Sequence, residues 1–267
     1  MKLTYFENEN TSPLVEEYYE LLCEEECIPF ESTILPLGHT NINFNFSSGY
    51  KALLKNKEIS LEGVIVSGQF YQSYQFLSNQ QGSSFGMSLH PTALYKILNT
   101  DISKLENKHL PLEKVHKDYS LQLYEIFDTY SNPKKAIKQI EAFLREIPLN
   151  INQNTILIDI AIDLIRTKEG LLNIEDILKE VNLSQKTLET QFKRIVGVTP
   201  GKYIRLNRFL NLMKKYGNQE IEIKDLIYMY NYYDSSHFNK DFKLFMNDTP
   251  TSYFSEDHPF IEQILKK

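Results

Sequence analysis

Two short stretches of this chain carry side chains suited to recognising nucleic acid. Both combine short or flexible hydrogen-bonding residues with lysines: Gln185, Lys186, Glu189, Thr190 and Lys193 in the first, and Ser235, Ser236, His237, Asn239 and Lys240 in the second. Hydroxyl, amide and carboxyl groups can read base edges in the major groove, while lysines bind phosphates. An ordinary solvated helix face has a similar composition, so one such stretch alone would not decide between the two interpretations.

A repeat that surrounds both stretches favours the nucleic-acid interpretation. The segment 173–200 is followed by a second copy at 222–250, with Phe-Lys and Thr-Pro pairs at a constant offset of 50 residues. The matched residues are Phe192, Lys193, Thr199 and Pro200 in the first copy and Phe242, Lys243, Thr249 and Pro250 in the second. Such fixed spacing indicates one structural unit present twice.

Each copy predicts two helices joined by a sharp turn. The first helix of each unit has one apolar stripe at helical spacing, formed by Ile174, Ile177, Leu178 and Val181 or by Ile223, Leu226, Ile227 and Tyr230. Asn182 and Asn231 follow where the chain must turn, usually through a positive φ that asparagine tolerates better than most residues. Ser184 and Asp234 are then placed to cap the second helices with their side-chain oxygens. The unit is therefore a helix-turn-helix.

Residues 184–200, Arg208 and residues 232–250 resemble the double helix-turn-helix DNA-binding domain of AraC-type (AraC/XylS) transcription regulators. The resemblance implies that double-stranded DNA is the partner and that the ten side chains named above bind it. A helix over 201–216 would hold the two units apart, and a separation of about 34 Å would place them in successive major grooves. Lys202, Arg205 and Arg208 on this helix either contact phosphates or form internal ion pairs, and a structural role is favoured for Arg208.

The sequence departs from the family pattern at six positions. Bulky residues replace a small one in each first helix, asparagines replace glycines, and threonine replaces a common arginine: Leu178, Ile227, Asn182, Asn231, Asn247 and Thr190. The bulky side chains of Leu178 and Ile227 affect helix packing, and Thr190 affects one base contact.

Charge is divided unevenly along the chain, whose net charge is −6. Residues 1–165 carry 13 basic and 21 acidic side chains, a net −8, whereas residues 166–255 carry 14 and 11, a net +3. A charge of +3 is modest for DNA binding, so we expect salt-sensitive affinity that depends on specific contacts or on two subunits. A homodimer is therefore expected.

Several classes of protein are disfavoured. No run of 18 apolar residues occurs and the N-terminal stretch is acidic and polar, so we expect a cytoplasmic protein without a membrane segment. Cys23 and Cys27 are predicted on one face of a helix as free structural thiols, with a two-thiol redox sensor as the alternative. His39 and His90 lack the partners of a metal site, and no nucleotide-binding or hydrolase motif appears. We therefore expect no enzyme activity, no metal and no cofactor.

The N-terminal part predicts a helix over 13–28 followed by short strands. The strands are expected at 33–37, 41–46, 63–67, 70–72, 74–77 and 85–89, with a loop at 51–57. Within 41–46, Ile42, Phe44 and Phe46 alternate with three asparagines, so the two sets should face opposite sides of a sheet. This spacing indicates a small antiparallel barrel or sandwich.

Aromatic residues are concentrated in the same region, and they either pack a core or line a ligand cavity. They are Phe44, Phe46, Tyr50, Phe70, Tyr71, Tyr74, Phe76 and Phe85. The segment also resembles, less specifically, the sensor domains of one branch of AraC-type regulators, through Pro36, Gly38, Asn41, Phe44, Asn45 and residues 86–91. That resemblance implies a domain that binds a small-molecule effector or mediates association, with cofactor-binding residues unknown.

The fold expected is α+β, with an N-terminal antiparallel β-barrel or sandwich flanked by helices and an all-α double helix-turn-helix domain. Helices are predicted over 91–99, 110–130, 133–147 and 154–167. We assign 1–112 to a sensor or association domain, 113–149 to a helical connector, 150–258 to the DNA-binding domain and 259–267 to a peripheral tail. The connector either builds a dimer interface or covers the barrel.

The function expected is sequence-specific, DNA-binding transcription regulation, controlled by a small molecule or partner through the N-terminal domain. Two alternatives stay open at this point. One is a ligand-binding protein whose degenerate helix-turn-helix no longer binds DNA, and the other is an enzyme domain joined to a DNA-binding domain.

Overall fold

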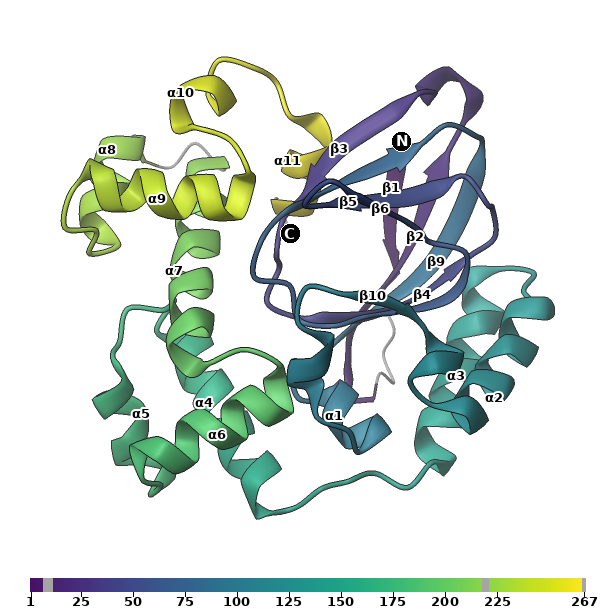
Figure 1. The fold of residues 1–267 in the computed structure, drawn as a ribbon, viewed down its shortest axis with the longest axis horizontal. Coiled ribbons are helices and arrows are strands. Elements are labelled where there is room, and N and C mark those ends of the chain that lie inside the picture. The colour runs from purple at the N-terminus through teal and green to yellow at the C-terminus, as the bar shows by residue number, and fades with distance from the viewer. Residues whose placement is uncertain (7–11, 218–220, 266–267) are drawn as a thin grey trace.

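The computed structural model describes residues 1–6, 12–217 and 221–265, and it has a β lobe and a helical lobe (Figure 1). We use β lobe for residues 1–149 and helical lobe for residues 150–265. The β lobe contains two antiparallel sheets that form a sandwich, and the expected α+β class is confirmed. The six-stranded sheet has the order β1 (Lys2–Phe6), β2 (Val15–Cys23), β9 (Gly82–Leu89), β4 (Thr40–Asn45), β7 (Gly63–Ser67) and β10 (His109–Pro111). The four-stranded sheet has the order β3 (Phe30–Ile34), β8 (Tyr74–Ser78), β5 (Tyr50–Leu54) and β6 (Lys57–Ser60).

The predicted alternation in β4 determines how the six-stranded sheet packs. Ile42 and Phe44 are buried on one face, which α2 (Lys117–Asp128) and α3 (Pro133–Glu146) cover. Phe127 of α2 stacks on Phe46 with ring centroids 5.0 Å apart and on Phe44 at 6.3 Å. Burying an aromatic side chain of this size stabilises a fold by about 1.5 to 3 kcal/mol. The apolar face is thus a helix-covered core, and the asparagines lie on the face toward the second sheet.

The N-terminal helix predicted over 13–28 is wrong. The segment forms β2 and a 3₁₀ turn, η1 (Glu25–Cys27), and β2 pairs with β1 on one side and β9 on the other. Both faces of this inner strand are covered, so its sequence lacks the period of two that marks a half-buried strand. Cys23 is buried at the end of β2, while Cys27 is half-buried in η1 and accepts a hydrogen bond from the N-terminal ammonium at 2.6 Å.

Other local predictions also need correction. The lysine-rich loop expected at 51–57 is a hairpin of β5 and β6, whose turn residues Lys55 and Asn56 both have positive φ. The strand expected at 70–72 is an irregular loop, while β1 and β10 were not predicted. The helix expected from residue 110 begins at Lys117, because residues 109–111 pair with β7 as β10.

Short elements of the β lobe pack against the helical lobe. After β9 the chain forms α1 (Ala93–Leu98) and the 3₁₀ helices η2 (Ile102–Leu105) and η3 (Leu112–Lys114). The helical lobe comprises α4 (Gln153–Thr167), α5 (Ile174–Val181), α6 (Gln185–Val196), α7 (Pro200–Gly217), α8 (Ile223–Met229), α9 (Ser235–Met246), α10 (Pro250–Tyr253) and α11 (Pro259–Leu265). One continuous cluster of buried apolar side chains runs through both lobes. Among the described residues, no helix is long and apolar enough to cross a membrane.

Residues 259–265, expected as a peripheral tail, pack against the rest of the protein. Helix α11 buries Phe260, Ile261 and Leu265, and it contacts both α7 and β3. The ring of Phe260 meets Phe30 edge to face at 5.3 Å. The expectation of a peripheral segment was wrong because three buried apolar side chains within seven residues are enough for one buried helix face.

Candidate nucleic-acid interface and an inter-sheet cavity

The first helix-turn-helix is formed by α5 and α6. Asn182 ends α5 in the left-handed conformation, with φ 43°, as the sequence predicted. Ser184 then caps α6, since its hydroxyl accepts a hydrogen bond from the backbone N–H of Thr187 at 3.2 Å. Leu188 and Phe192 anchor the buried face of α6. The turn and the cap together fix the direction in which α6 leaves α5.

The second helix-turn-helix, α8 and α9, repeats this arrangement. Asn231 has φ 54°, and Asp234 caps α9 by accepting from the backbone N–H of His237 at 2.8 Å. Phe238 and Phe242 are buried at the positions that match Leu188 and Phe192. Asn247 ends α9 with φ 57°. Asparagine, and not glycine, therefore occupies the left-handed position at all three of these turns, Asn182, Asn231 and Asn247.

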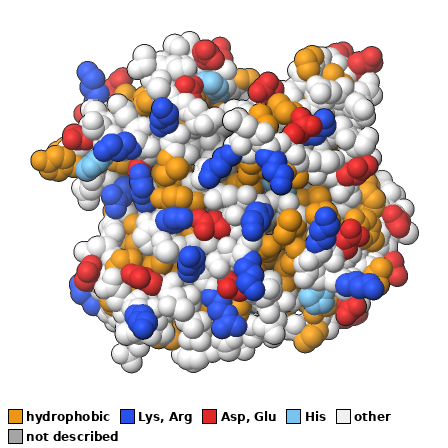
Figure 2. All heavy atoms as spheres, viewed as in Figure 1, with side chains coloured by type: hydrophobic (Ala, Val, Ile, Leu, Met, Phe, Trp, Pro, Cys, Tyr) orange, Lys and Arg blue, Asp and Glu red, His pale blue; other side chains and the backbone are white. Residues whose placement is uncertain are grey.

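All ten predicted contact residues are exposed, and the two helices that carry them are separated by α7 (Figure 1). Figure 1 shows α6 and α9 running in the same general direction with α7 between them, their N-terminal ends pointing away from the β lobe. Some of the ten have partners in their own helix: Gln185 donates to Glu189 at 3.0 Å, and the Thr190 hydroxyl donates to the backbone oxygen of Lys186 at 2.8 Å. Figure 2 shows Lys and Arg side chains gathered over the helical lobe and its junction with the β lobe.

The three α7 cations whose role the sequence left open have internal partners. Arg205 pairs with the buried carboxylate of Asp241 on α9, and Nε of Arg208 donates to the backbone oxygen of Gly170 at 3.2 Å. Lys202 pairs with Glu106 of the β lobe at 2.6 Å. Of the two roles left open for these residues, internal pairing is the one that the structure shows.

Two exposed aromatic residues were missed by the sequence analysis. The side chain of Tyr233 is 88% exposed just before the cap of α9, and Tyr228 is 83% exposed on α8. The Tyr233 ring lies 6.0 Å from that of His237, one of the predicted contact residues. The two neighbouring tyrosines at 232 and 233 could have predicted this exposure. Only one of them can pack between the two helices of the unit, so the other must face solvent.

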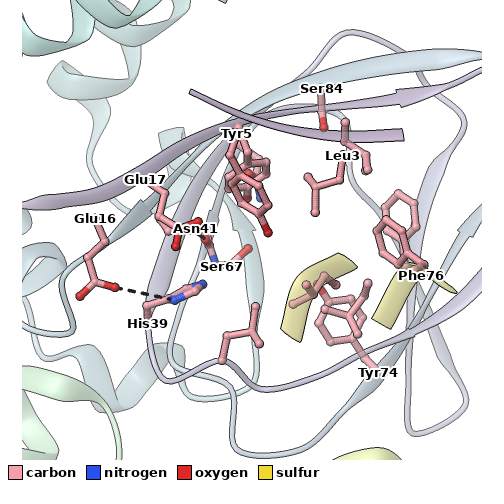
Figure 3. Close-up of a pocket in the computed structure, with 18 of the residues that line it drawn as sticks. Leu3, Tyr5, Glu16, Glu17, His39, Asn41, Ser67, Tyr74, Phe76 and Ser84 are labelled. Atoms are coloured by element: carbon pink, nitrogen blue, oxygen red, sulfur yellow. Dashed lines mark hydrogen bonds and ion pairs between the residues drawn. The ribbon is translucent and has the colours of Figure 1, made fainter. Parts of the chain in front are cut away.

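A cavity of about 580 Å³ lies between the two sheets of the β lobe. The wall from the six-stranded sheet is rich in amides and hydroxyls, contributed by Asn41, Asn43, Asn45, Ser67, Ser84 and Ser88. Figure 3 shows Tyr5, Asn41 and Ser67 projecting into the space that Tyr74 and Phe76 close from the opposite sheet. Residues of α7 and α11, including Asn207 and Phe260, complete the lining.

The aromatic residues thus have both of the predicted roles. Phe44, Phe46 and Phe85 pack with the rings of α2 and its C-terminal flank, whereas Tyr74 and Phe76 line the cavity. The choice between a packed core and a lined cavity was decided by the sheet face on which each ring lies.

His109 is the cavity residue that the sequence analysis overlooked. Its Nδ1 lies 2.8 Å from the Ser67 hydroxyl, while its buried Nε2 has no hydrogen-bond partner among the described residues. Burial lowers the pKa of His109 to about 3, so the imidazole is neutral at physiological pH. The unpaired nitrogen of a neutral imidazole can donate or accept a hydrogen bond with a ligand, depending on the tautomer.

The two histidines that were considered belong to interlobe networks. His39 lies 3.9 Å from Glu16, which pairs with Arg166 of α4 at 2.5 Å. His90 lies 2.9 Å from the Thr92 hydroxyl, and burial lowers its pKa to about 4. No group of three or more potential metal ligands occurs within the part of the chain that the structure describes.

The fold and the exposed faces of α6 and α9 define a DNA-binding protein of the double helix-turn-helix class. Residues 177–256 match a helix-turn-helix domain family, and residues 8–111 match a domain of unknown function (DUF6597). The helix-turn-helix match and the relatives named below support an AraC-type transcription regulator with a C-terminal double helix-turn-helix domain.

Its relatives include two proteins named for transcription. The chain is 24% identical over 113 residues to the HTH-type transcriptional activator AarP of Providencia stuartii, covering 42% of this chain and 84% of AarP. It is 29% identical over 89 residues to the probable transcription factor PqrA of Proteus vulgaris, covering 33% of this chain and 72% of PqrA. A crystal structure of ToxT from Vibrio cholerae aligns with a TM-score of 0.48 and 14% identity, covering 89% of this chain and 96% of that one.

Proposed function

We propose that α6 and α9 enter successive major grooves of one face of double-stranded DNA and that the protein thereby activates transcription. The observation that carries the proposal is that both helices are directed by matching asparagine turns and caps, with all ten candidate contact residues exposed. The name of AarP as an activator supports the activating role. The ten residues are Gln185, Lys186, Glu189, Thr190, Lys193, Ser235, Ser236, His237, Asn239 and Lys240.

Within this interface we assign different roles to three lysines. Lys186 and Lys240 lie on the exposed faces of α6 and α9 where base edges would be read, whereas Lys193 lies farther from the cap of α6 and would contact phosphate. A contact to a base edge discriminates between sequences, and a phosphate contact strengthens binding to all sequences.

The test selects preferred sites from random DNA with the full-length chain and measures Kd on selected and random DNA across salt concentrations. Lys186→Ala and Lys240→Ala are expected to lose about 1 to 3 kcal/mol on selected DNA only, while Lys193→Ala weakens binding to both DNAs. Lys138→Ala, an exposed lysine of α3, is the matched control and should change neither affinity. Equal losses on both DNAs for Lys186→Ala and Lys240→Ala would refute the base-reading assignment.

We also propose that the inter-sheet cavity binds a small-molecule effector with several hydrogen-bonding groups. The face of a sheet that points into a sandwich is normally apolar, whereas here it carries amides and hydroxyls around a cavity of about 580 Å³. Thermal-shift screening of polar metabolites should find a stabilising ligand. Asn43→Leu should abolish its binding, because the substitution removes an amide from the wall. If no polar compound binds and Asn43→Leu only stabilises the fold, the cavity is a solvent-filled space.

The division of labour along the chain follows from these two sites. We propose a sensor in 1–112, a helical connector in 113–149 and a DNA-binding domain in 150–258, acting in the cytoplasm as a homodimer. The modest net charge of +3 over 166–255 supports the use of two subunits. Leu121, 60% exposed on α2, places an apolar side chain on the outer face of the connector. Sedimentation equilibrium of the wild-type chain and of Leu121→Glu tests the dimer and this surface.

A further inference from the structure

The segment that joins β7 to β8, residues 68–73, lies between the cavity and the DNA-binding units. We call it the bridging loop. The residues that flank it, Ser67 and Tyr74, both line the cavity. Its middle residues contact the helical lobe. The loop therefore joins the cavity lining to the buried side of α9, whose exposed side carries the second set of proposed DNA contacts.

The base of the bridging loop is attached to His109. The Phe70 ring lies 4.6 Å from the imidazole and 4.9 Å from the ring of Tyr74, and Tyr74 meets the imidazole edge to face at 4.8 Å. Ser67 lies within hydrogen-bond distance of Nδ1 of the same imidazole. His109 itself lines the cavity, and its Nε2 is buried without a hydrogen-bond partner among the described residues. A ligand group that satisfies this nitrogen removes the cost of a buried, unpaired polar atom, so the ligand is drawn to the ring that supports the loop.

The tip of the bridging loop is seated against α7 and α9. Tyr71 is buried, and its ring meets that of Phe245 on α9 edge to face at 5.3 Å. The ammonium of Lys202 on α7 lies 4.9 Å from the centre of the same ring, a cation–π contact. Tyr71 therefore contacts both α9 and α7, the helix that separates the two helix-turn-helix units.

The loop is held too tightly to bend independently of these contacts. The backbone N–H of Tyr71 donates to Asn107 Oδ1 at 2.8 Å, and the backbone N–H of Asn107 donates to the oxygen of Gln69 at 3.0 Å. Gln69 is fully buried and packs beside Gly197, the residue that ends α6. Gln69 and Asn107 hold the backbone of the loop in a close-packed environment, so a displacement of Phe70 also moves Tyr71.

We propose that the bridging loop couples occupancy of the cavity to the position of α9, with His109 as the sensing residue and Tyr71 as the contact that transmits the change. This inference rests on the proposed function of the two sites. A ligand hydrogen-bonded to Nε2 of His109 shifts the Phe70 stack, and the shift changes how Tyr71 is seated between Phe245 and Lys202. The DNA affinity of the second unit then depends on the ligand without any contact between ligand and DNA.

The test uses the full-length chain, with no need to know the ligand. Hydrogen exchange is measured for the amides of residues 238–247 in wild type, His109→Gln, Tyr71→Ala and the double variant. Each single variant is expected to accelerate exchange in this segment on the order of tenfold, because each removes a part of the same connection. The double variant should exchange no faster than the faster single variant.

Two controls keep the result interpretable. Ser60→Ala changes an exposed residue of β6 that lies outside the cavity lining and outside the bridging loop, and it should leave exchange in 238–247 unchanged. Protection of the β4 and β9 amides reports whether each variant keeps its fold. If either single variant unfolds the β lobe, Phe70→Leu replaces it, since leucine removes the ring stack and keeps an apolar side chain.

The outcomes separate this inference from the proposed function. Unchanged exchange in 238–247 for His109→Gln, or additive effects in the double variant, would overturn the coupling. Non-additive acceleration supports it even if the wild-type chain binds no DNA, an outcome that would instead overturn the proposed function. With DNA binding present, both single variants should also change Kd for selected DNA several-fold, and Ser60→Ala should not.

Discussion

Asn182 and Asn231 determine the geometry of the two DNA-binding units through single backbone angles. Their φ values of 43° and 54° lie in the left-handed region. Most residues are strained there by their Cβ, whereas glycine has no Cβ and asparagine tolerates the conformation better than most residues. Both residues are exposed, so burial of the side chain does not explain their presence. The backbone requirement alone accounts for the residue type.

Substitutions at Asn231 test this account. Asn231→Gly should be neutral or mildly stabilising, because glycine takes positive φ without strain, whereas Asn231→Val should cost on the order of 1 to 3 kcal/mol. Thermal unfolding measures the stability, and DNA affinity should fall with it in the valine variant because the turn directs α9. If valine proves the milder change, the left-handed turn does not constrain the unit.

His109 makes the stability of the protein depend on pH. Its pKa of about 3 in the folded chain lies below the ordinary value of 6.5, so the unfolded chain binds a proton that the folded chain does not. Stability is therefore lost as the pH falls from about 6.5 toward 3, at up to about 1.4 kcal/mol per pH unit. Urea unfolding at pH 7.5 and pH 5 should show a loss of about 2 kcal/mol from this residue.

The matched variant is His109→Gln, which keeps a polar side chain that does not titrate. Its unfolding free energy should fall less between pH 7.5 and pH 5 than that of wild type. A smaller dependence should remain, because burial lowers the pKa of His90 to about 4 and acts in the same direction. Identical pH dependence in both proteins would show that His109 is not neutral in the fold.

The difference between Asn231 and His109 shows which residues a sequence can reveal. The asparagine turns and the caps at Ser184 and Asp234 depend on neighbours within four residues, so local pattern predicted them correctly. His109 gains its significance from Ser67, 42 residues away, through the pairing of β10 with β7. Long-range pairing of this kind leaves no local signal.

At the scale of elements, helix α9 depends on its N-terminal cap. Asp234→Ala removes the acceptor for the His237 N–H and should destabilise the protein by about 1 kcal/mol, whereas Asp234→Asn keeps an acceptor and should cost little. Chemical denaturation of both variants measures the difference. Equal losses would assign the effect to the charge of Asp234 and not to its hydrogen bond.

Two of the elements that were predicted wrongly, β2 and the β5–β6 hairpin, each have a physical reason. In β2, Tyr18 donates to the buried carboxylate of Glu141 on α3, while Tyr19 donates to Asn43 on the cavity side. A strand with buried polar partners on both faces shows no alternation. In the β5–β6 hairpin, Lys51 of the inner strand β5 pairs with Glu58 of the edge strand β6 at 2.7 Å. Charged residues of this kind look like a loop in the sequence, although on β6 they protect the edge of the sheet.

At the scale of the whole molecule, the two lobes share one core and several polar contacts. Lys96 on α1, nearly buried, pairs with Asp159 on α4 at 2.7 Å, and the Thr92 hydroxyl donates to the same carboxylate at 2.6 Å. The Tyr203 hydroxyl donates to the backbone oxygen of Gly38 at 3.2 Å. The sequence indicated two domains, but the extent of their contact depends on tertiary packing that no local pattern encodes.

Because the apolar core is continuous, the chain should unfold in a single calorimetric transition. Asp159→Ala should lower the unfolding free energy by about 2 to 3 kcal/mol, since it leaves the Lys96 ammonium largely buried without its carboxylate. Asp176→Ala removes a carboxylate from the exposed pair with Lys179, and apart from the lost helix-capping contact to Asn173 it should cost little. Two separate transitions in the wild-type chain would contradict the single core, and equal effects of the two substitutions would show that the Lys96–Asp159 pair does not hold the lobes together.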